Sequence, residues 1–221
     1  MPAQTACTLR LNVTYNANGG SGGPSYTEYA QATVMMADLP YTLSVSLANT
    51  TPSRTGYTFQ GWSVSSSASS ASYQPGGTYS YTFYDAVSGG TTTHNTTMYA
   101  VWKKRTYTVA YKKGANGTGT EVNDTKTYGV ALTLRGAIFT RTNYEQVGWS
   151  TTDGGAQEYS LGASYTANAA ITLYPVWKKL TYAYVKVGGA WKEAQIYVKN
   201  GGEWKEVTGA YVKVSGAWKP T

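Results

Sequence analysis

One ten-residue phrase occurs twice in the chain with the same internal spacing. Residues 54–63 read RTGYTFQGWS and residues 141–150 read RTNYEQVGWS, so Arg, Thr, Tyr, Gly, Trp and Ser return in the same order. Each copy is followed downstream by a second motif that ends in Trp-Lys-Lys, MYAVWKK at 98–104 and LYPVWKK at 173–179. Self-similarity over such a distance marks whole folding units in tandem rather than a short motif. The chain therefore contains two related modules.

The two copies differ in the length of the segment between their tryptophans. It spans 40 residues from Trp62 to Trp102 but 28 residues from Trp149 to Trp177. The additional residues fall around 79–95, YSYTFYDAVSGGTTTHN, where Gly, Thr and Ser are frequent. Because insertions are tolerated best at the surface, we expect a lengthened hairpin or loop there.

The composition favours sheet over helix. The 221 residues include 21 Tyr, 7 Trp and 25 Gly but only 3 Phe, and aromatic residues suit a pleated surface while glycines suit turns. Stretches such as TYTVAY at 106–111 alternate apolar and polar residues with a period of two. The sequence predicts a mainly β protein. Helix is expected only in short pieces, near 28–39, where Pro40 would end it, or at the turn entering Arg54.

The last 42 residues follow a different pattern. Three copies of a Tyr-Val-Lys strand, a glycine turn and a Trp-Lys strand occupy 183–194, 196–207 and 210–221. Each copy predicts a β-hairpin, in which we expect the Tyr to share a face with the fourth strand residue, Val or Asn. A lone two-stranded hairpin is marginal in water, so the three must pack together, on the preceding module or on other chains.

These words resemble a known family. YNANGG at 15–20, RTGYTFQGWS at 54–63 and MYAVWKK at 98–104 are similar to the Listeria–Bacteroides repeat, the InlB B-repeat-like β-grasp module of bacterial surface proteins. The second copy matches through NYEQVGWS and LYPVWKK. The resemblance implies two tandem β-grasp-like modules without enzymatic activity, used as spacer or adhesion elements. The tail resembles the YVKV…WK hairpin repeats of virion proteins of phages and prophages.

The domain boundaries follow from the repeats. We expect an N-terminal segment at 1–8, module 1 at 9–104, module 2 at 105–179 and a three-hairpin tail at 180–221. Gly61 and Gly148 are expected to let a neighbouring element approach the backbone, and Trp62 and Trp149 to anchor the two cores. A buried Trp is worth several kcal/mol at about 25 cal/mol per Å², a large share of a small module's stability. The full set of expected structural anchors is Gly61, Trp62, Trp102, Gly148, Trp149 and Trp177.

The residues that carry chemistry are few. His94 is the single histidine and falls in the inserted segment, where a solvated loop residue is the simplest interpretation. Cys7 is the single cysteine and excludes an intrachain disulfide. No nucleotide-binding or calcium-binding motif occurs, and NANGGSGGP at 16–24 predicts a turn rather than a phosphate loop. We therefore expect no enzyme, no cofactor and no metal.

Charge and exposed aromatic residues bear on the partners. The formal charge is +7, yet residues 1–102 hold two basic and three acidic groups, so we do not expect nucleic acid as a partner. No apolar stretch is long enough for a membrane span, and no export signal is recognisable. The regularly spaced Trp191, Trp204 and Trp218 are candidate contacts to sister chains or to a host-surface glycan.

Three functions remain in view at this point. The first is a structural protein of a phage or phage-like particle, made in the host cytoplasm and located in the virion, where it contacts other virion proteins or forms a homo-oligomer. It would be a decoration, fibre or tail-associated protein. The second is a bacterial cell-surface adhesin fragment. The third is a glycan-binding module.

Overall fold

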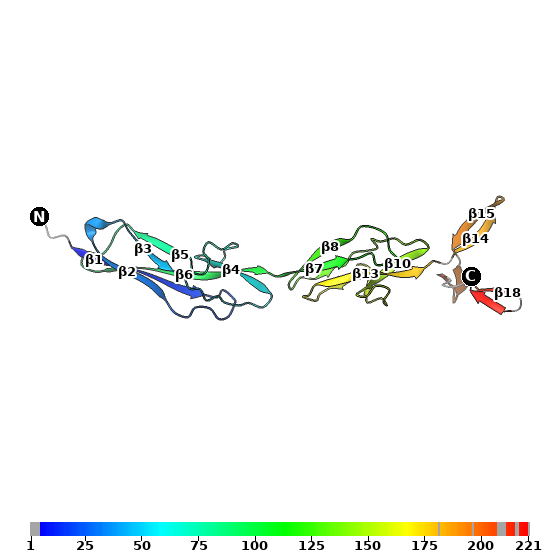
Figure 1. Ribbon diagram of the computed structural model, residues 1–221, viewed down its shortest axis with the longest axis horizontal. Coiled ribbons are helices and arrows are strands. Elements are labelled where there is room, and N and C mark those ends of the chain that lie inside the picture. Colours follow the sequence, from blue (N-terminus) through cyan, green and yellow to red (C-terminus); the bar gives the residue numbers. More distant parts are fainter. Residues whose placement is uncertain (1–4, 181, 196, 207–210, 215–216, 221) are drawn as a thin grey trace. The chain divides into compact units, whose positions relative to one another are not determined.

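The chain folds almost entirely into strands, which confirms the prediction of a mainly β protein. The structure is a computed structural model (Figure 1) that describes residues 5–180, 182–195, 197–206, 211–214 and 217–220. Within these residues the regular elements are strands, apart from one short 3-10 helix. The chain divides into two compact units, Met1–Thr106 and Tyr107–Thr221.

Module 1 consists of two sheets. A four-stranded sheet has the order β2-β1-β6-β4, and a two-stranded sheet pairs β3 with β5. The first and last strands, β1 and β6, lie side by side in the middle of the larger sheet and run parallel, with Tyr15 opposite Met98. The bounds are β1 Ala6–Asn16, β2 Glu28–Met35, the 3-10 helix η1 Met36–Asp38, β3 Tyr41–Ser46, β4 Tyr57–Ser63, β5 Thr78–Phe83 and β6 Thr91–Lys104.

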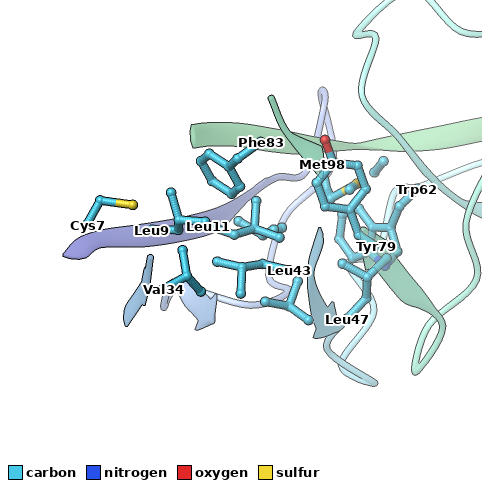
Figure 2. Packing of buried hydrophobic residues seen from close by; sticks show 13 residues of the cluster. Cys7, Leu9, Leu11, Val34, Leu43, Leu47, Trp62, Tyr79, Phe83 and Met98 are labelled. Atoms are coloured by element: carbon cyan, nitrogen blue, oxygen red, sulfur yellow. The ribbon is translucent and has the colours of Figure 1, made fainter. Parts of the chain in front are cut away.

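The alternation in β1 shows why this segment is a strand. Its odd-numbered residues from 7 to 13 are buried, and the residues between them face outward or lie at the surface. Figure 2 shows Leu9 and Leu11 facing Val34 and Leu43, with Trp62 at the other end of the cluster. Side chains of opposite parity cannot reach this core, because successive strand residues point to opposite faces. The smaller sheet thus covers one face of the larger sheet.

Module 2 repeats this plan with shorter strands. Its five-stranded sheet has the order β11-β10-β13-β7-β8, with β13 parallel to β7, and β9 pairs with β12 over the core. The core contains buried residues from both sheets, among them Tyr111, Trp149 and Tyr165. The bounds are β7 Thr106–Tyr111, β8 Val122–Thr127, β9 Leu132–Thr133, β10 Tyr144–Ser150, β11 Tyr159–Ser160, β12 Ser164–Tyr165 and β13 Ile171–Lys179.

The tail contains three two-stranded antiparallel hairpins. They pair β14 with β15, β16 with β17, and β18 with β19. Side chains are described here only for residues 186–192 and 197–205. The bounds are β14 Tyr182–Val187, β15 Ala190–Gln195, β16 Tyr197–Asn200, β17 Glu203–Glu206, β18 Tyr211–Val214 and β19 Ala217–Pro220.

Two expectations about local structure were only partly right. Of residues 28–39, the short helical piece is η1, Met36–Asp38, which ends before Pro40 as expected. Glu28–Met35 form strand β2 instead, because Ala30, Ala32 and Val34 alternate toward the core and period two prevails over helix propensity. The inserted segment is not simply a loop. It lengthens β5 and β6, which pair with β3 and β1 respectively and not with each other.

Candidate functional site

The repeated phrase begins with a tight turn in both modules. The backbone nitrogen of Tyr57 donates to the carbonyl of Arg54 at 3.1 Å, and Tyr144 donates to Arg141 at the same distance. Each guanidinium lies over the ring of its tyrosine, 4.0 Å from the centroid in module 1 and 3.7 Å in module 2. A guanidinium over a tyrosine ring is attracted by the negative face of that ring. The Arg-Thr-x-Tyr spacing is therefore the spacing of a stacked turn.

The glycine of the phrase lies where a neighbouring backbone segment comes very close. A Cβ on Gly61 would come within 2.5 Å of the carbonyl oxygen of Tyr73, and its φ of +127° strains any residue with a side chain. A Cβ on Gly148 would lie 2.7 Å from the carbonyl oxygen of Tyr159. A β-bulge precedes both glycines and turns the following tryptophan into the core. The glycine is required because the neighbouring backbone occupies the space of a side chain.

The two tryptophans have closely similar surroundings. Trp62 and Trp149 are both 0% exposed, and each meets a tyrosine edge to face, Tyr15 at 5.0 Å and Tyr111 at 4.9 Å between centroids. Burial raises the pKa of both tyrosine hydroxyls. Each hydroxyl accepts a backbone N–H from the segment after the smaller sheet's first strand. The two modules therefore have separate but equivalent cores, each built around one buried indole.

The second tryptophan of each copy is only partly buried. Trp102 donates through Nε1 to the carbonyl of Ala17 at 2.9 Å, which ties the end of β6 to the first turn. Its ring meets Phe59 edge to face at 5.6 Å. Trp177 is likewise partly buried and packs at the margin of the module 2 core. Both therefore contribute to a core while retaining an exposed part.

A groove lies against the repeated turn of module 1. It has a volume of about 540 Å³ and is lined by Arg54, Tyr57, Phe59, Trp102 and Arg105 together with Ser and Thr side chains. We call it the arginine groove. Its lining residues include no carboxylate. It combines aromatic surface, hydroxyl groups and two fixed positive charges.

Arg105 closes one side of this groove. Its backbone nitrogen donates to Gly56 at 2.9 Å and its Nε donates to the carbonyl of Tyr57 at 3.3 Å. In module 2 the same backbone bond runs from Leu180 to Asn143, also at 2.9 Å. The second guanidinium is thus a feature of module 1 alone among the two copies. Sequence reasoning missed it, although the run Lys103-Lys104-Arg105 differs visibly from Lys178-Lys179-Leu180.

The tail hairpins present tryptophans to the solvent. Trp191 and Trp204 are each 68% exposed, and the ammonium groups of Lys186 and Lys199 lie 6.0 and 5.8 Å from their ring centroids. Lys186 and Lys199 are the direct cross-strand partners of these tryptophans. The third residue, Trp218, lies outside the residues whose side chains are described.

The expected distribution of faces in these hairpins was wrong. Lys199 and Trp204 occupy opposite positions in the two strands and so share a face, and Tyr197, two residues before Lys199, lies on the same face. Asn200, the fourth strand residue, lies on the other face with Val198. Because side chains alternate with a period of two, the first strand residue shares a face with the third, and not with the fourth as expected.

His94 lies in β6 and not in a solvated loop. Its ring stacks on Tyr81 with a centroid distance of 3.5 Å and an interplanar angle of 8°, and burial lowers its pKa. The hydroxyl of Tyr79 lies 3.5 Å from its Nε2. Cys7 is buried in the module 1 core at 2% exposure. The structure thus brings His94 together with Tyr79 and Tyr81, and Cys7 with apolar side chains.

Across the described part of the chain, no three side chains of His, Cys, Asp or Glu gather closely enough to hold a metal ion. No described helix has the length and apolar character needed to cross a membrane.

Comparison with known protein families identifies a repeat domain. The profile of the Listeria-Bacteroides repeat domain matches residues 12–101 and again residues 107–176, which together form most of the chain. The two matched ranges contain the buried tryptophans Trp62 and Trp149 and most of the residues of the two cores. No curated protein matches the chain.

Proposed function

The chain belongs to the Listeria-Bacteroides repeat domain family, and from this premise we propose that it is a non-enzymatic structural protein of a phage or phage-like particle. The family match indicates a repeat protein of the surface or adhesion type. In the proposal, the two modules act as spacers and the tail hairpins attach the chain to a partner.

The exposure of Trp191 and Trp204 carries this proposal. Both rings are 68% exposed on hairpins whose other described side chains are also exposed. Large aromatic side chains in this state are typical of interfaces, where they supply most of the binding energy. Two-stranded hairpins gain independent stability only by packing on something else. The tail is therefore proposed to be completed by sister chains or by another particle protein.

The choice of a particle rests on the tail sequence. The YVKV…WK hairpins resemble repeats of phage and prophage virion proteins, and here they follow two adhesion-type modules in one chain. A bacterial cell-surface adhesin is the second candidate, and the repeat family itself favours it. The two candidates share the display role and differ in the object that carries the chain.

Localisation distinguishes the candidates. Gold-labelled antibodies against the whole chain would be applied to intact producing cells and to particles purified from their lysates. Labelling of regular positions on particles is the expected result. Labelling of intact cell surfaces with unlabelled particles would instead establish the adhesin.

The role of the tail has its own experiment. Mass photometry of the full chain is expected to show a concentration-dependent oligomer, and the variant W191A/W204A is expected to dissociate into monomers with both modules folded. A paired control, Y26A/Y84A, removes two exposed aromatic side chains from module 1. A double variant that keeps the oligomer intact would contradict the proposed role of these tryptophans.

A further inference from the structure

The arginine groove of module 1 has the composition of a binding site for an anionic ligand with a ring. Its volume of about 540 Å³ lies within the range of about 300–1,000 Å³ of small-molecule sites. Two guanidiniums, from Arg54 and Arg105, face a groove without acidic lining residues. Charge complementarity therefore requires a negatively charged ligand.

Both guanidiniums are held in place before any ligand arrives. Arg54 is stacked on Tyr57 at 4.0 Å and donates through Nη1 to the carbonyl of Asn18 at 3.4 Å. Arg105 donates through Nε to the carbonyl of Tyr57 at 3.3 Å. A guanidinium has five N–H donors, and each of these two hydrogen bonds uses one. Fixing the forks in advance lowers the entropy lost on binding a carboxylate.

Within the described part of the chain, no carboxylate competes for these donors. Among the residues the structure describes, no ion pair involves Arg54 or Arg105. Thr58, which pairs with Lys103 across the strands, lines the groove and adds a hydroxyl group. An incoming carboxylate thus replaces water rather than a salt bridge.

The remaining surface of the groove suits a saccharide. Phe59 and Trp102 offer aromatic surface, and Trp102 is fixed by its bond to Ala17. Ser53, Thr55 and Thr58 are exposed and line the same groove, where their hydroxyls can donate to and accept from ligand hydroxyls. A sugar has an apolar ring face for the aromatic side chains and hydroxyls for the polar ones. A nucleic acid would need a longer basic surface than module 1 carries.

Module 2 provides an internal comparison. It keeps the stacked Arg141 and Tyr144, but Leu180 takes the place of Arg105 and Gln146 takes the place of Phe59. Glu145 takes the place of Thr58 and is the cross-strand partner of Lys178. The corresponding surface therefore has one guanidinium fewer and one carboxylate more.

From these observations we propose that the arginine groove of module 1 binds an acidic saccharide, whose carboxylate is held between Arg54 and Arg105 while a sugar ring rests on Phe59 and Trp102. This inference does not depend on a particle or on the tail.

The test uses the full chain in solution and three ligands. These are trigalacturonic acid, the neutral galactose trisaccharide and a triglutamate peptide, each titrated by calorimetry at two salt concentrations. We expect saturable binding of trigalacturonic acid that weakens with salt, and at least tenfold weaker binding of the other two. Neutral binding of equal strength, equal binding of the peptide, or no binding of trigalacturonic acid up to about 10 mM would each overturn the proposal.

Three variants locate the site. Arg105→Leu copies module 2 and is expected to weaken binding at least tenfold, and Arg54→Lys is expected to do the same because lysine lacks the planar fork. Lys113→Leu makes the same change of charge and size on exposed surface in module 2 and is expected to leave affinity within about twofold. Hydrogen exchange of the strands of the substituted module verifies that each variant is folded. Unchanged affinity in a folded Arg105→Leu variant would place any binding elsewhere.

Discussion

The indole Nε1 of Trp149 donates to the carbonyl oxygen of Arg135 at 2.8 Å. The matching atom of Trp62 is equally buried but has no acceptor within hydrogen-bond distance among the described residues. Two side chains with nearly identical ring contacts thus differ in one polar interaction. An unpaired buried donor loses its hydration without compensation.

This difference predicts unequal effects of removing the donor. Trp149→Phe should destabilise module 2 by about 1–3 kcal/mol more than Trp62→Phe destabilises module 1. Only the substitution at Trp149 breaks a hydrogen bond and leaves the carbonyl of Arg135 without its donor. Urea titration of the full chain, followed by hydrogen exchange of β10 and β4, measures the two losses separately. Equal losses would show that the bond to Arg135 contributes nothing net.

The close approach of a neighbouring backbone at Gly61 predicts a steric effect of substituting this glycine. Gly61→Ala should unfold module 1 or destabilise it by at least about 3 kcal/mol, because the new methyl group meets the Tyr73 carbonyl at 2.5 Å and φ is +127°. Gly129→Ala serves as control, since its Cβ would meet nothing within 4 Å although φ is +70°. The control carries only the backbone strain, expected at about 1 kcal/mol. Similar melting temperatures for both variants would show that the clash with the Tyr73 carbonyl does not cause the loss of stability.

The buried side chain of Lys126 predicts that its packing matters more to stability than its charge. It is 0% exposed and donates to the carbonyl of Thr127 at 3.0 Å and to Oδ1 of Asn168 at 3.2 Å. Lys126→Ala should destabilise module 2 by about 2–4 kcal/mol through lost packing and lost bonds. Lys126→Met keeps the volume and removes the cost of burying a charge, so it should stay within about 1 kcal/mol of the parent. Hydrogen exchange of β7 and β13 reports both, and an alanine variant as stable as the methionine variant would exclude a packing role.

Glu158 predicts acid sensitivity in module 2. Its carboxylate accepts from the hydroxyl of Thr151, from the Thr151 backbone nitrogen at 2.8 Å and from Ser150 Oγ at 3.1 Å, and these bonds lower its pKa from 4.5. Because the folded-state pKa lies below the unfolded one, the stabilisation is present above about pH 4.5 and is lost as pH falls through the lowered value.

The measurement is the hydrogen exchange of β10 and β11 amides between pH 7 and pH 3, corrected for intrinsic rates. Glu158→Gln should be less stable at neutral pH and should lose this part of the pH dependence. A glutamine variant that retains the full acid loss would assign the effect to other carboxylates, such as Glu121, whose pKa is lowered by its bond to Lys112.

Much of the fold is legible in the sequence because its signals are local. Period-two alternation and the spaced Gly-Trp phrase predict a mainly β tandem repeat, and the structure and the family match both confirm this. The division at 1–8, 9–104, 105–179 and 180–221 remains a prediction.

What the sequence did not reveal depends on pairing over long distances. His94 was assigned to a loop because Gly89, Gly90 and several threonines surround it, yet β1 supplies a parallel partner with Leu11 opposite His94. The arginine groove likewise joins residues 51–59 to Arg105, and only the pairing of β4 with β6 brings them together. Neither neighbour is visible in a local window.

The parallel pairing of β1 with β6 has a mechanical consequence. The chain enters module 1 at one end of this pair and leaves at the other, so tension between the entry and exit points loads the shared hydrogen bonds in shear. Bonds loaded in this way must rupture together, whereas those of a hairpin such as β16–β17 open one after another from the ends. Single-molecule pulling should therefore record a high rupture force for module 1 and a much lower one for the hairpin, so that the two parts of the chain yield to tension in separate steps.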